Sequence, residues 1–149
     1  MILRADVTEP QASEILHIGA HVIALEEPDT FVLRAVGDVS GEEVTGFLDV
    51  FERFVEGRRR GYIAIDLARV GHVTPEARRV SGIRQLPPAY AGLVLFGGSF
   101  QQQLVVRLAA MAGWYLRGRA LGKPKPAVVT HEWQARAWLA ERRAEADAT

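Results

Sequence analysis

Apolar residues recur at two different spacings along the chain, and these spacings distinguish the predicted strands from the predicted helices. Residues 62–67 and 90–96 are nearly continuous apolar runs bounded by glycines, as expected of strands that are covered on both faces. Residues 31–36 show a two-residue alternation after a weaker strand pattern at 21–25, and the Glu-Glu-Pro-Asp-Thr turn between them predicts a hairpin. A short final strand is expected at 127–129. The pattern therefore predicts five strands.

Four stretches with apolar residues at helical spacing follow these strands. Ser40 and Glu43 form a capping box ahead of the first helix, because each side chain can satisfy the other's free backbone amide. Thr74 precedes a proline and an acidic residue at the start of the second helix, which a later proline pair keeps short. The third helix is expected over about 100–121, and the last runs to about residue 143.

The order of elements is strand, strand, helix, strand, helix, strand, helix, strand, helix. Helices that connect parallel strands form crossovers, and the first hairpin supplies an antiparallel partner. The order thus predicts an α/β fold with a single mixed five-stranded sheet and about four helices. Residues 1–19 lack clear periodicity and are interpreted as an N-terminal extension with at most a short turn. Residues 20–143 are predicted to form the domain, and residues 144–149 a frayed C-terminal tail.

The composition excludes several classes of protein. The 149 residues include no cysteine, which rules out a disulfide framework, a thiolate zinc site, an iron–sulfur cluster and a cysteine nucleophile. A hydrophobic content of 48% with 24% charged residues is typical of a globular domain and not of a disordered chain. No apolar run reaches the roughly 20 residues of a membrane span. The first ten residues lack the apolar stretch of a secretory signal, so we expect a cytoplasmic protein.

The charges are segregated along the chain, although 18 basic and 18 acidic residues cancel. Residues 1–56 contain twelve acidic and three basic residues, whereas residues 57–126 contain twelve basic and two acidic residues. Such segregation is typical either of two halves that meet inside one fold or of two surfaces with different partners. Aromatic residues do not interleave with the arginines, so the pattern does not favour nucleic-acid binding.

Four segments of the chain resemble a known family. They are HVIALEEPDTFVLRAVGDVSGEEVTGFLDVF, IAIDLARVGHVTPEARR, LVLFGGSF and HEWQARAWLAERR. Together they are similar to the SpoIIAA-like group of STAS domains, whose architecture is shared with CRAL-TRIO lipid-transfer domains. The resemblance covers residues 20–143. It implies a small α/β regulatory or binding domain without chemistry of its own.

This resemblance bears on one candidate modification site. The anti-sigma-antagonist branch of STAS domains carries a phosphorylatable serine at the start of the helix after the third strand. Alignment on Asp66 places Pro75 at that position, so the resemblance implies that the phosphoacceptor is missing here. Thr74 offers a neighbouring hydroxyl at the helix N-terminus, where an added phosphate would be stabilised. An ordinary N-cap explains the same threonine more simply.

Gly97, Gly98 and Ser99 form a second candidate site, between a buried strand and a helix. Glycines let backbone amides converge on an anion, but a tight turn with a serine cap explains the same residues. The turn matches neither the dinucleotide-binding pattern nor the P-loop pattern, so no cofactor is predicted. His72 and His131 could share the sheet edge with Ser99, yet no metal-ligand spacing and no nucleophile elbow accompany them. We therefore predict neither a metal site nor an enzyme.

The helix at 100–121 is apolar round most of its circumference. One stripe is expected to face the sheet, and it consists of Leu104, Leu108, Met111 and Tyr115. Val106, Ala110 and Trp114 extend the apolar zone beyond that stripe. Such a zone is covered by another element, by a partner or by an apolar ligand. We expect Trp114 and its neighbours to form a homodimer contact; the alternative is that Trp114 covers the sheet edge or packs under residues 1–19.

Two functions are compatible with these features. The first is a non-enzymatic STAS-like regulatory or scaffolding module that acts through contacts with an unidentified protein partner or with a second copy of itself. The alternative is a module that binds or senses an apolar or amphiphilic, lipid-like small molecule. The shared architecture with lipid-transfer domains and the apolar helix favour this alternative. Neither function requires a cofactor, a nucleic acid or a membrane span.

Overall fold

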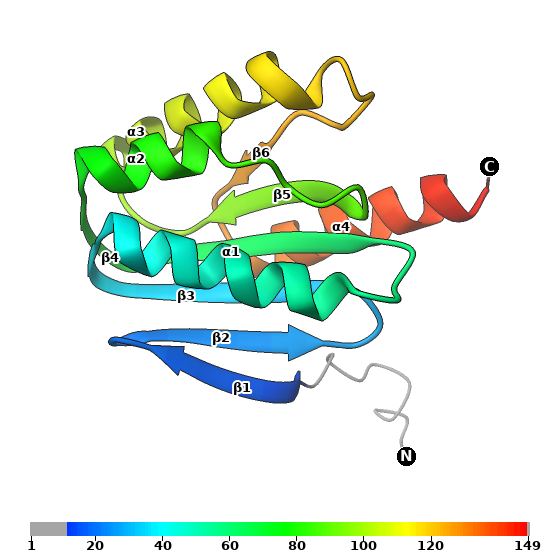
Figure 1. Cartoon of the computed structure of the whole chain (residues 1–149), viewed down its shortest axis with the longest axis horizontal. Coiled ribbons are helices and arrows are strands. Elements are labelled where there is room, and N and C mark those ends of the chain that lie inside the picture. The colour runs from blue at the N-terminus through cyan, green and yellow to red at the C-terminus, as the bar shows by residue number, and fades with distance from the viewer. Residues whose placement is uncertain (1–11, 149) are drawn as a thin grey trace.

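The computed structural model describes residues 12–148, the side chain of residue 117 excepted, and shows one mixed sheet with helices on both faces (Figure 1). The strands are β1 (Ala12–Ile18), β2 (His21–Glu26), β3 (Thr30–Val39), β4 (Gly61–Val73), β5 (Tyr90–Phe96) and β6 (Ala127–Val129). They lie in the sheet in chain order. The β1–β2 and β2–β3 pairs are antiparallel, and the three later pairs are parallel.

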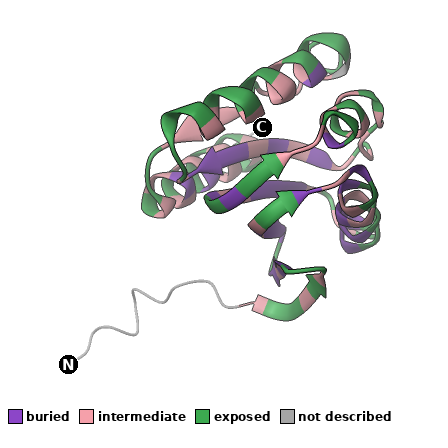
Figure 2. Ribbon diagram, turned by 90° about the vertical axis from the view of Figure 1, so that its left-hand side faces the viewer, coloured by how far each residue is buried: buried purple, intermediate pink, exposed green. Residues whose placement is uncertain are grey.

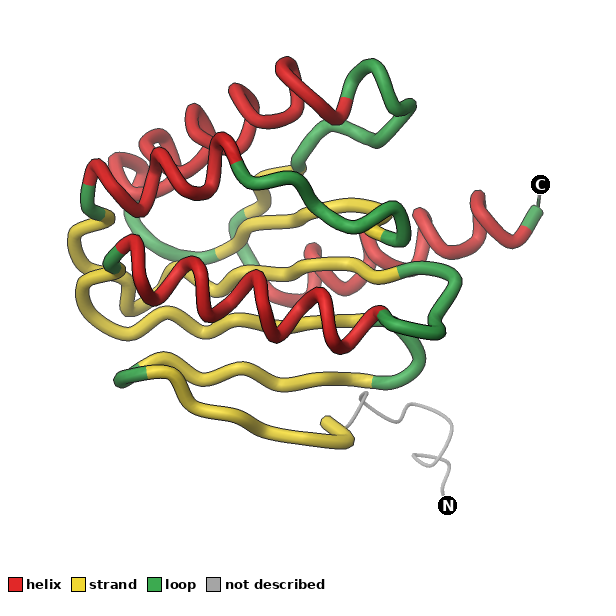
Figure 3. The backbone as a smooth tube through the Cα atoms, viewed as in Figure 1, coloured by secondary structure: helices red, strands yellow, loops and turns green. Residues whose placement is uncertain are grey.

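Each parallel step in the sheet needs a crossover, and helices supply these connections. The helices are α1 (Gly41–Val55), α2 (Pro75–Ile83), α3 (Phe100–Gly113) and α4 (Glu132–Asp147), and a π-helical turn, η2 (Trp114–Gly118), continues α3. Figures 1 and 3 show α1, α2 and α3 on one face of the sheet and α4 on the other. The mixed α/β sheet, its antiparallel N-terminal hairpin and the four helices are therefore confirmed.

The prediction of five strands is wrong, because residues 12–18 form a sixth. β1 pairs antiparallel with β2, and Ile15 lies opposite Ala24. Leu16 packs against the core, whereas Ile15 is exposed on the other face of this edge strand. Two adjacent apolar residues that point to opposite faces hide the alternation that marks a strand in the sequence. The segment interpreted as an extension thus contributes a strand to the sheet.

Two helix ends differ from the prediction. α4 continues to Asp147, whose carboxylate lies 2.8 Å from the guanidinium of Arg60, so residues 144–147 are helical rather than frayed. The helix predicted at 100–121 is α-helical only to Gly113 and then widens into the π-helical turn that ends at Gly118. Such π turns are rare and occur mostly as single turns.

The predicted helix caps are present. The Ser40 hydroxyl accepts a hydrogen bond from the Glu43 N–H at 3.1 Å, and the Ser40 N–H donates to the Glu43 carboxylate at 3.0 Å. Thr74 caps α2, because its hydroxyl accepts a hydrogen bond from the Ala77 N–H at 3.1 Å. The N-cap interpretation of Thr74 is therefore confirmed.

Two apolar clusters form the core, one on each face of the sheet, and Figure 2 shows the buried residues concentrated in the sheet and on the inner sides of the helices. Phe51 of α1 lies at the centre of the first cluster. Its ring packs edge-on against Phe31 and Tyr90, with ring centroids 5.7 and 6.3 Å away. Under α4, the smaller cluster includes Tyr62 of β4 and Leu139 of the helix.

We expect Phe51→Ala to lower the free energy of unfolding by about 3–5 kcal/mol, because a fully buried ring leaves a cavity. Phe100→Ala removes the same atoms from a side chain that is 78% exposed, and it should change that free energy by no more than about 0.5 kcal/mol. Urea unfolding followed by circular dichroism measures both. Equal losses in the two variants would contradict the central position of Phe51.

Candidate functional site

An apolar cavity of about 570 Å³ lies between the sheet and the helices α1, α2 and α3. Its floor is formed by β3, β4 and β5, through side chains that include Leu33, Ile65 and Leu93. Phe47 of α1 and Val106 of α3 belong to its walls. Small-molecule sites have volumes of roughly 300–1,000 Å³ and are mostly apolar. By size and lining, this cavity is a candidate ligand site.

Small side chains on the covering helices leave this space open. α3 lines the cavity with Val106, Ala109, Ala110 and Gly113. The short α2 buries only Ala77. Larger side chains at these positions would reach the sheet and fill the space to the density of an ordinary protein interior. Apolar walls offer water few hydrogen-bond partners, so the space suits an apolar guest.

The structure reverses the predicted orientation of α3. Leu104, Leu108 and Tyr115, which were expected to face the sheet, are exposed, and Leu108 is 62% exposed. Val106 and Ala110, which were expected on a free outer face, pack against the core and line the cavity. A helix that is apolar all round carries no periodic signal for its inner face. The smaller residues of α3 thus face the sheet, and the larger ones face outward.

Trp114 contacts residues of η2 and of the loop that follows it. Its indole N–H donates a hydrogen bond to the Lys123 carbonyl at 2.7 Å, and its ring lies edge-on to Tyr115 with centroids 5.3 Å apart. The Lys125 ammonium lies 5.3 Å from the indole ring. Trp114 is half-buried and lines the cavity together with Val106 and Ala110. Three predicted site residues thus meet at one cavity, and Trp114 covers it from the η2 end.

The Gly97-Gly98-Ser99 turn is explained by backbone geometry. Both glycines have positive φ, and a side chain at Gly98 would lie 2.9 Å from the Leu67 carbonyl. The Ser99 hydroxyl caps α3 by accepting a hydrogen bond from the Gln102 N–H at 3.2 Å. These residues do not line the apolar cavity. The structure therefore assigns them the turn and the cap, and a ligand role for them stays a prediction.

A chain of ion pairs lies under α4, on the opposite face of the sheet. Arg34 of β3 contacts Asp66 of β4 at 2.9 Å and Glu132 of α4 at 3.1 Å. Arg136 contacts Glu132 at 3.1 Å and also pairs with the buried Glu26. No local motif signals this network, because Glu26 and Arg136 are 110 positions apart. Only the folded chain brings these groups together.

The ion pairs connect α4 to the sheet and favour the charged form of Glu132. The hydrogen bond from Arg34 is the main cause that lowers the pKa of Glu132 below its ordinary value, and Arg136 lowers it further. The hydrogen bond to Glu26 raises the pKa of Arg136. Glu132 therefore stays ionised at neutral pH. Within residues 12–148, no group of three His, Cys, Asp or Glu side chains is arranged to hold a metal ion.

Comparison with known proteins gives a likeness of fold. No family model matches the chain, and no curated protein matches its sequence. Among solved structures, the chain resembles an uncharacterized protein of the DUF3478 family with a SpoIIAA-like fold from Shewanella loihica PV-4. The match covers 89% of this chain and 96% of the other, with a TM-score of 0.52 and 14% sequence identity. The fold is SpoIIAA-like.

The SpoIIAA-like fold presents two different faces. One carries the apolar cavity under α2 and α3, and the other carries the ion pairs under α4. In the part of the chain that the structure describes, no helix combines the length and the apolar character that crossing a membrane requires. The similarity to the Shewanella protein concerns the fold alone, so the site is argued from its own residues.

The ion pairs predict a pH dependence of stability. The pKa of Glu132 is lower in the folded state than the ordinary 4.5, so its ionised form stabilises the fold above that pH. This contribution is lost as the pH falls through the folded-state pKa. We expect Glu132→Gln to lower the free energy of unfolding at neutral pH by on the order of 1 kcal/mol, because the pair is partly exposed.

In this variant, the decline in stability below about pH 5 should also be shallower than in the wild type. Urea unfolding at a series of pH values measures both effects. Glu141→Gln, at an exposed position on the same helix, is the control. An unchanged pH profile in Glu132→Gln would contradict the role of these ion pairs.

Proposed function

We propose that this protein binds one apolar or amphiphilic small molecule in the cavity between α2, α3 and the sheet, and that it catalyses no reaction. This proposal rests on the properties of the cavity. It has a volume of about 570 Å³, it is lined mostly by apolar side chains, and it lies between the sheet and the helices α1, α2 and α3. The expectation of a lipid-like ligand is consistent with this geometry.

Energetics also support binding at this place. An apolar guest that enters the cavity gains roughly 25 cal/mol for each Å² of apolar surface removed from water. It also makes contacts with lining groups that lack neighbours across an empty space. A bound ligand stabilises the folded state by mass action, since the unfolded chain has no cavity. Binding should therefore raise the unfolding temperature.

The residues under α4 support a function without catalysis. A catalytic carboxylate needs access to a substrate and an adjustable proton. Asp66 and Glu132 share the guanidinium of Arg34, and Glu26 pairs with Arg136. No hydrogen bond joins Ser99 to His72 or His131 in residues 12–148, and the His131 ring stacks on Trp133. The chemistry that the described residues offer is recognition.

Binding of N-phenyl-1-naphthylamine, a neutral fluorophore that brightens in apolar surroundings, tests the proposal. We expect the wild type to bind it and Ala110→Phe to bind it at least about tenfold more weakly, because the new ring occupies the cavity. Ala112→Phe places the same ring on the exposed side of α3 and should leave binding unchanged. Absent binding in the wild type, or equal binding by both variants, would contradict the proposal.

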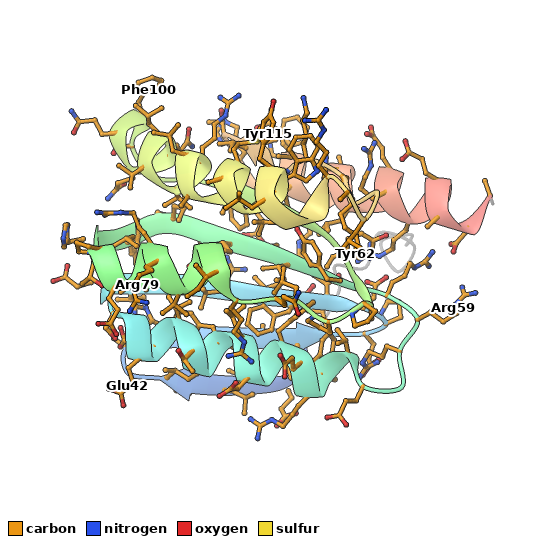
Figure 4. The ribbon with its side chains drawn as sticks, turned by 45° about the horizontal axis from the view of Figure 1, so that its top comes forward. Glu42, Arg59, Tyr62, Arg79, Phe100 and Tyr115 are labelled. Atoms are coloured by element: carbon orange, nitrogen blue, oxygen red, sulfur yellow. The ribbon has the colours of Figure 1, made fainter. Side chains whose placement is uncertain are left out.

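A protein contact is the second candidate, and the outer face of α3 favours it. Large apolar side chains are exposed there in succession: Phe100, Leu104, Leu108, Tyr115 and Leu116. Figure 4 shows Phe100 and Tyr115 pointing away from the sheet. Clustered exposed apolar residues mark interaction surfaces. A regulatory or scaffolding contact, including a homodimer, would use this face rather than Trp114, which is tied to its own loop.

Analytical ultracentrifugation tests self-association through this outer face. We expect the wild type to dimerise at high concentration and Leu108→Glu to remain a folded monomer, because a charge at the centre of an apolar contact is costly. Arg107→Glu introduces the same acid at a neighbouring exposed position that is already polar, and it serves as the comparison. A wild type that stays monomeric at every concentration would exclude the homodimer.

A further inference from the structure

The cavity carries charge of one sign only. Among the described residues that line it, the charged side chains are Arg78 of α2 and Lys123 of the loop between η2 and β6. Both are cationic, and no described aspartate or glutamate belongs to the lining. A cation at the rim of an apolar, low-dielectric space attracts an anion more strongly than it would in water. The lining thus favours a guest with a negative end.

These two cations differ from most of the arginines around them. Arg34, Arg84 and Arg136 each pair with carboxylates. In contrast, Arg78 donates to the Val73 carbonyl at 2.7 Å, and Lys123 donates to the Pro88 carbonyl at 2.9 Å. Neither has a carboxylate within 4 Å among the described residues. A carbonyl oxygen carries only part of a charge, so both positive charges remain uncompensated.

Lys123 is the better placed of the two for an anionic head group. Its ammonium reaches Pro88 in the loop after α2, and this loop and the loop of Lys123 lie at the same end of the molecule (Figure 3). An ammonium has three N–H donors, and the Pro88 carbonyl uses one. Lys125, beside the Trp114 ring, adds a second cation near this end. The head-group end of the cavity is thus defined by Lys123, Lys125 and Trp114.

Arg78 lies at the other end of α2. The helix has nine residues, which corresponds to about 13 Å at 1.5 Å per residue. Arg78 is the fourth residue of the helix, but its guanidinium donates to the Val73 carbonyl just before the helix begins. Pro88 lies five residues beyond Ile83, the last residue of the helix. Ser81 and Gln85 also line the cavity between these ends, and the floor of β3, β4 and β5 is apolar. The space between the two cations is therefore lined mainly by apolar side chains, which suits the chain of an amphiphile.

We infer that the ligand is a single-chain amphiphile with an anionic head group, whose chain fills the apolar cavity and whose head group binds the Lys123 ammonium. This inference rests on the proposed function and assigns the chemical class of its ligand. The head group is a carboxylate or a phosphate monoester, since both accept hydrogen bonds from an ammonium. Lys123 is half-buried at this end of the cavity, so the head group bound to it keeps part of its hydration while the chain is desolvated.

Displacement of N-phenyl-1-naphthylamine by dodecanoate, dodecyl phosphate and dodecan-1-ol tests the inference. The three compounds share one chain and differ in head-group charge, and each is used below its critical micelle concentration. We expect the anions to displace the fluorophore at concentrations at least about tenfold lower than the alcohol, since hydrogen bonds to charged groups are the stronger ones. Tighter binding of dodecyl phosphate than of dodecanoate would assign the phosphate monoester, and the reverse order the carboxylate.

Three variants locate the head group. Lys123→Gln retains an N–H donor for the Pro88 carbonyl but loses the charge, and it should lose most of the preference for the anions over the alcohol. Arg79→Gln removes the same charge from an exposed residue outside the cavity, and it should keep the anion preference. Arg78→Gln should also keep it, because Arg78 lies at the far end. Circular dichroism confirms that each variant is folded.

The outcomes separate the inference from the proposed function. Equal displacement by dodecanoate and dodecan-1-ol in the wild type, with the fluorophore still bound in the cavity, would overturn the anionic ligand and leave the proposed function intact. Loss of the anion preference in Arg78→Gln instead of Lys123→Gln would overturn the assignment of the head group to Lys123. A wild type that does not bind the fluorophore would overturn both.

Discussion

The candidate site of this protein depends on which face of α3 points toward the sheet. Val106, Ala110 and Gly113 turn inward and let the helix lie over β4 and β5, but they are too small to fill the space beneath it. The same rotation directs Leu104 and Leu108 outward. The orientation of α3 thus produces both the cavity and the exposed apolar face. The same helix therefore carries residues of both candidate binding surfaces, the cavity and the outer apolar face.

The two faces of the sheet are held by different interactions. α1 packs through phenylalanines, with Phe51 at the centre of an aromatic cluster. α4 is held by guanidinium–carboxylate pairs at Glu26 and Glu132 around a small apolar contact through Leu139. Charged pairs need defined geometry, whereas an apolar wall tolerates small shifts of a helix. The candidate cavity therefore lies on the face that apolar packing holds, and ion pairs hold α4 on the other face.

The segregation of charge along the chain is resolved inside the fold. Acidic residues of the first half meet basic residues from later segments: Arg58 contacts Glu27 at 2.7 Å, and Arg84 contacts Glu52 at 2.9 Å. Arg136 and Arg143 of α4 pair with acids of β2 and of the turn after it. Part of the charge of the two halves is thus neutralised by these pairs. Arg78 and Lys123 at the cavity contact carbonyl oxygens instead of carboxylates, so their charges are available to an anionic ligand.

Local patterns in the sequence were sufficient for the hairpin, the helix caps at Ser40 and Thr74, the order of the central elements and the SpoIIAA-like fold, because each depends on neighbouring residues or on short characteristic segments. The edge strand β1 was missed because adjacent apolar residues concealed its alternation. The inner face of α3, the cavity and the ion pairs under α4 were decided only by tertiary packing. In a helix that is apolar all round, no pattern in the sequence marks the face that packs against the sheet. Charged residues 110 positions apart become partners only when the chain is folded.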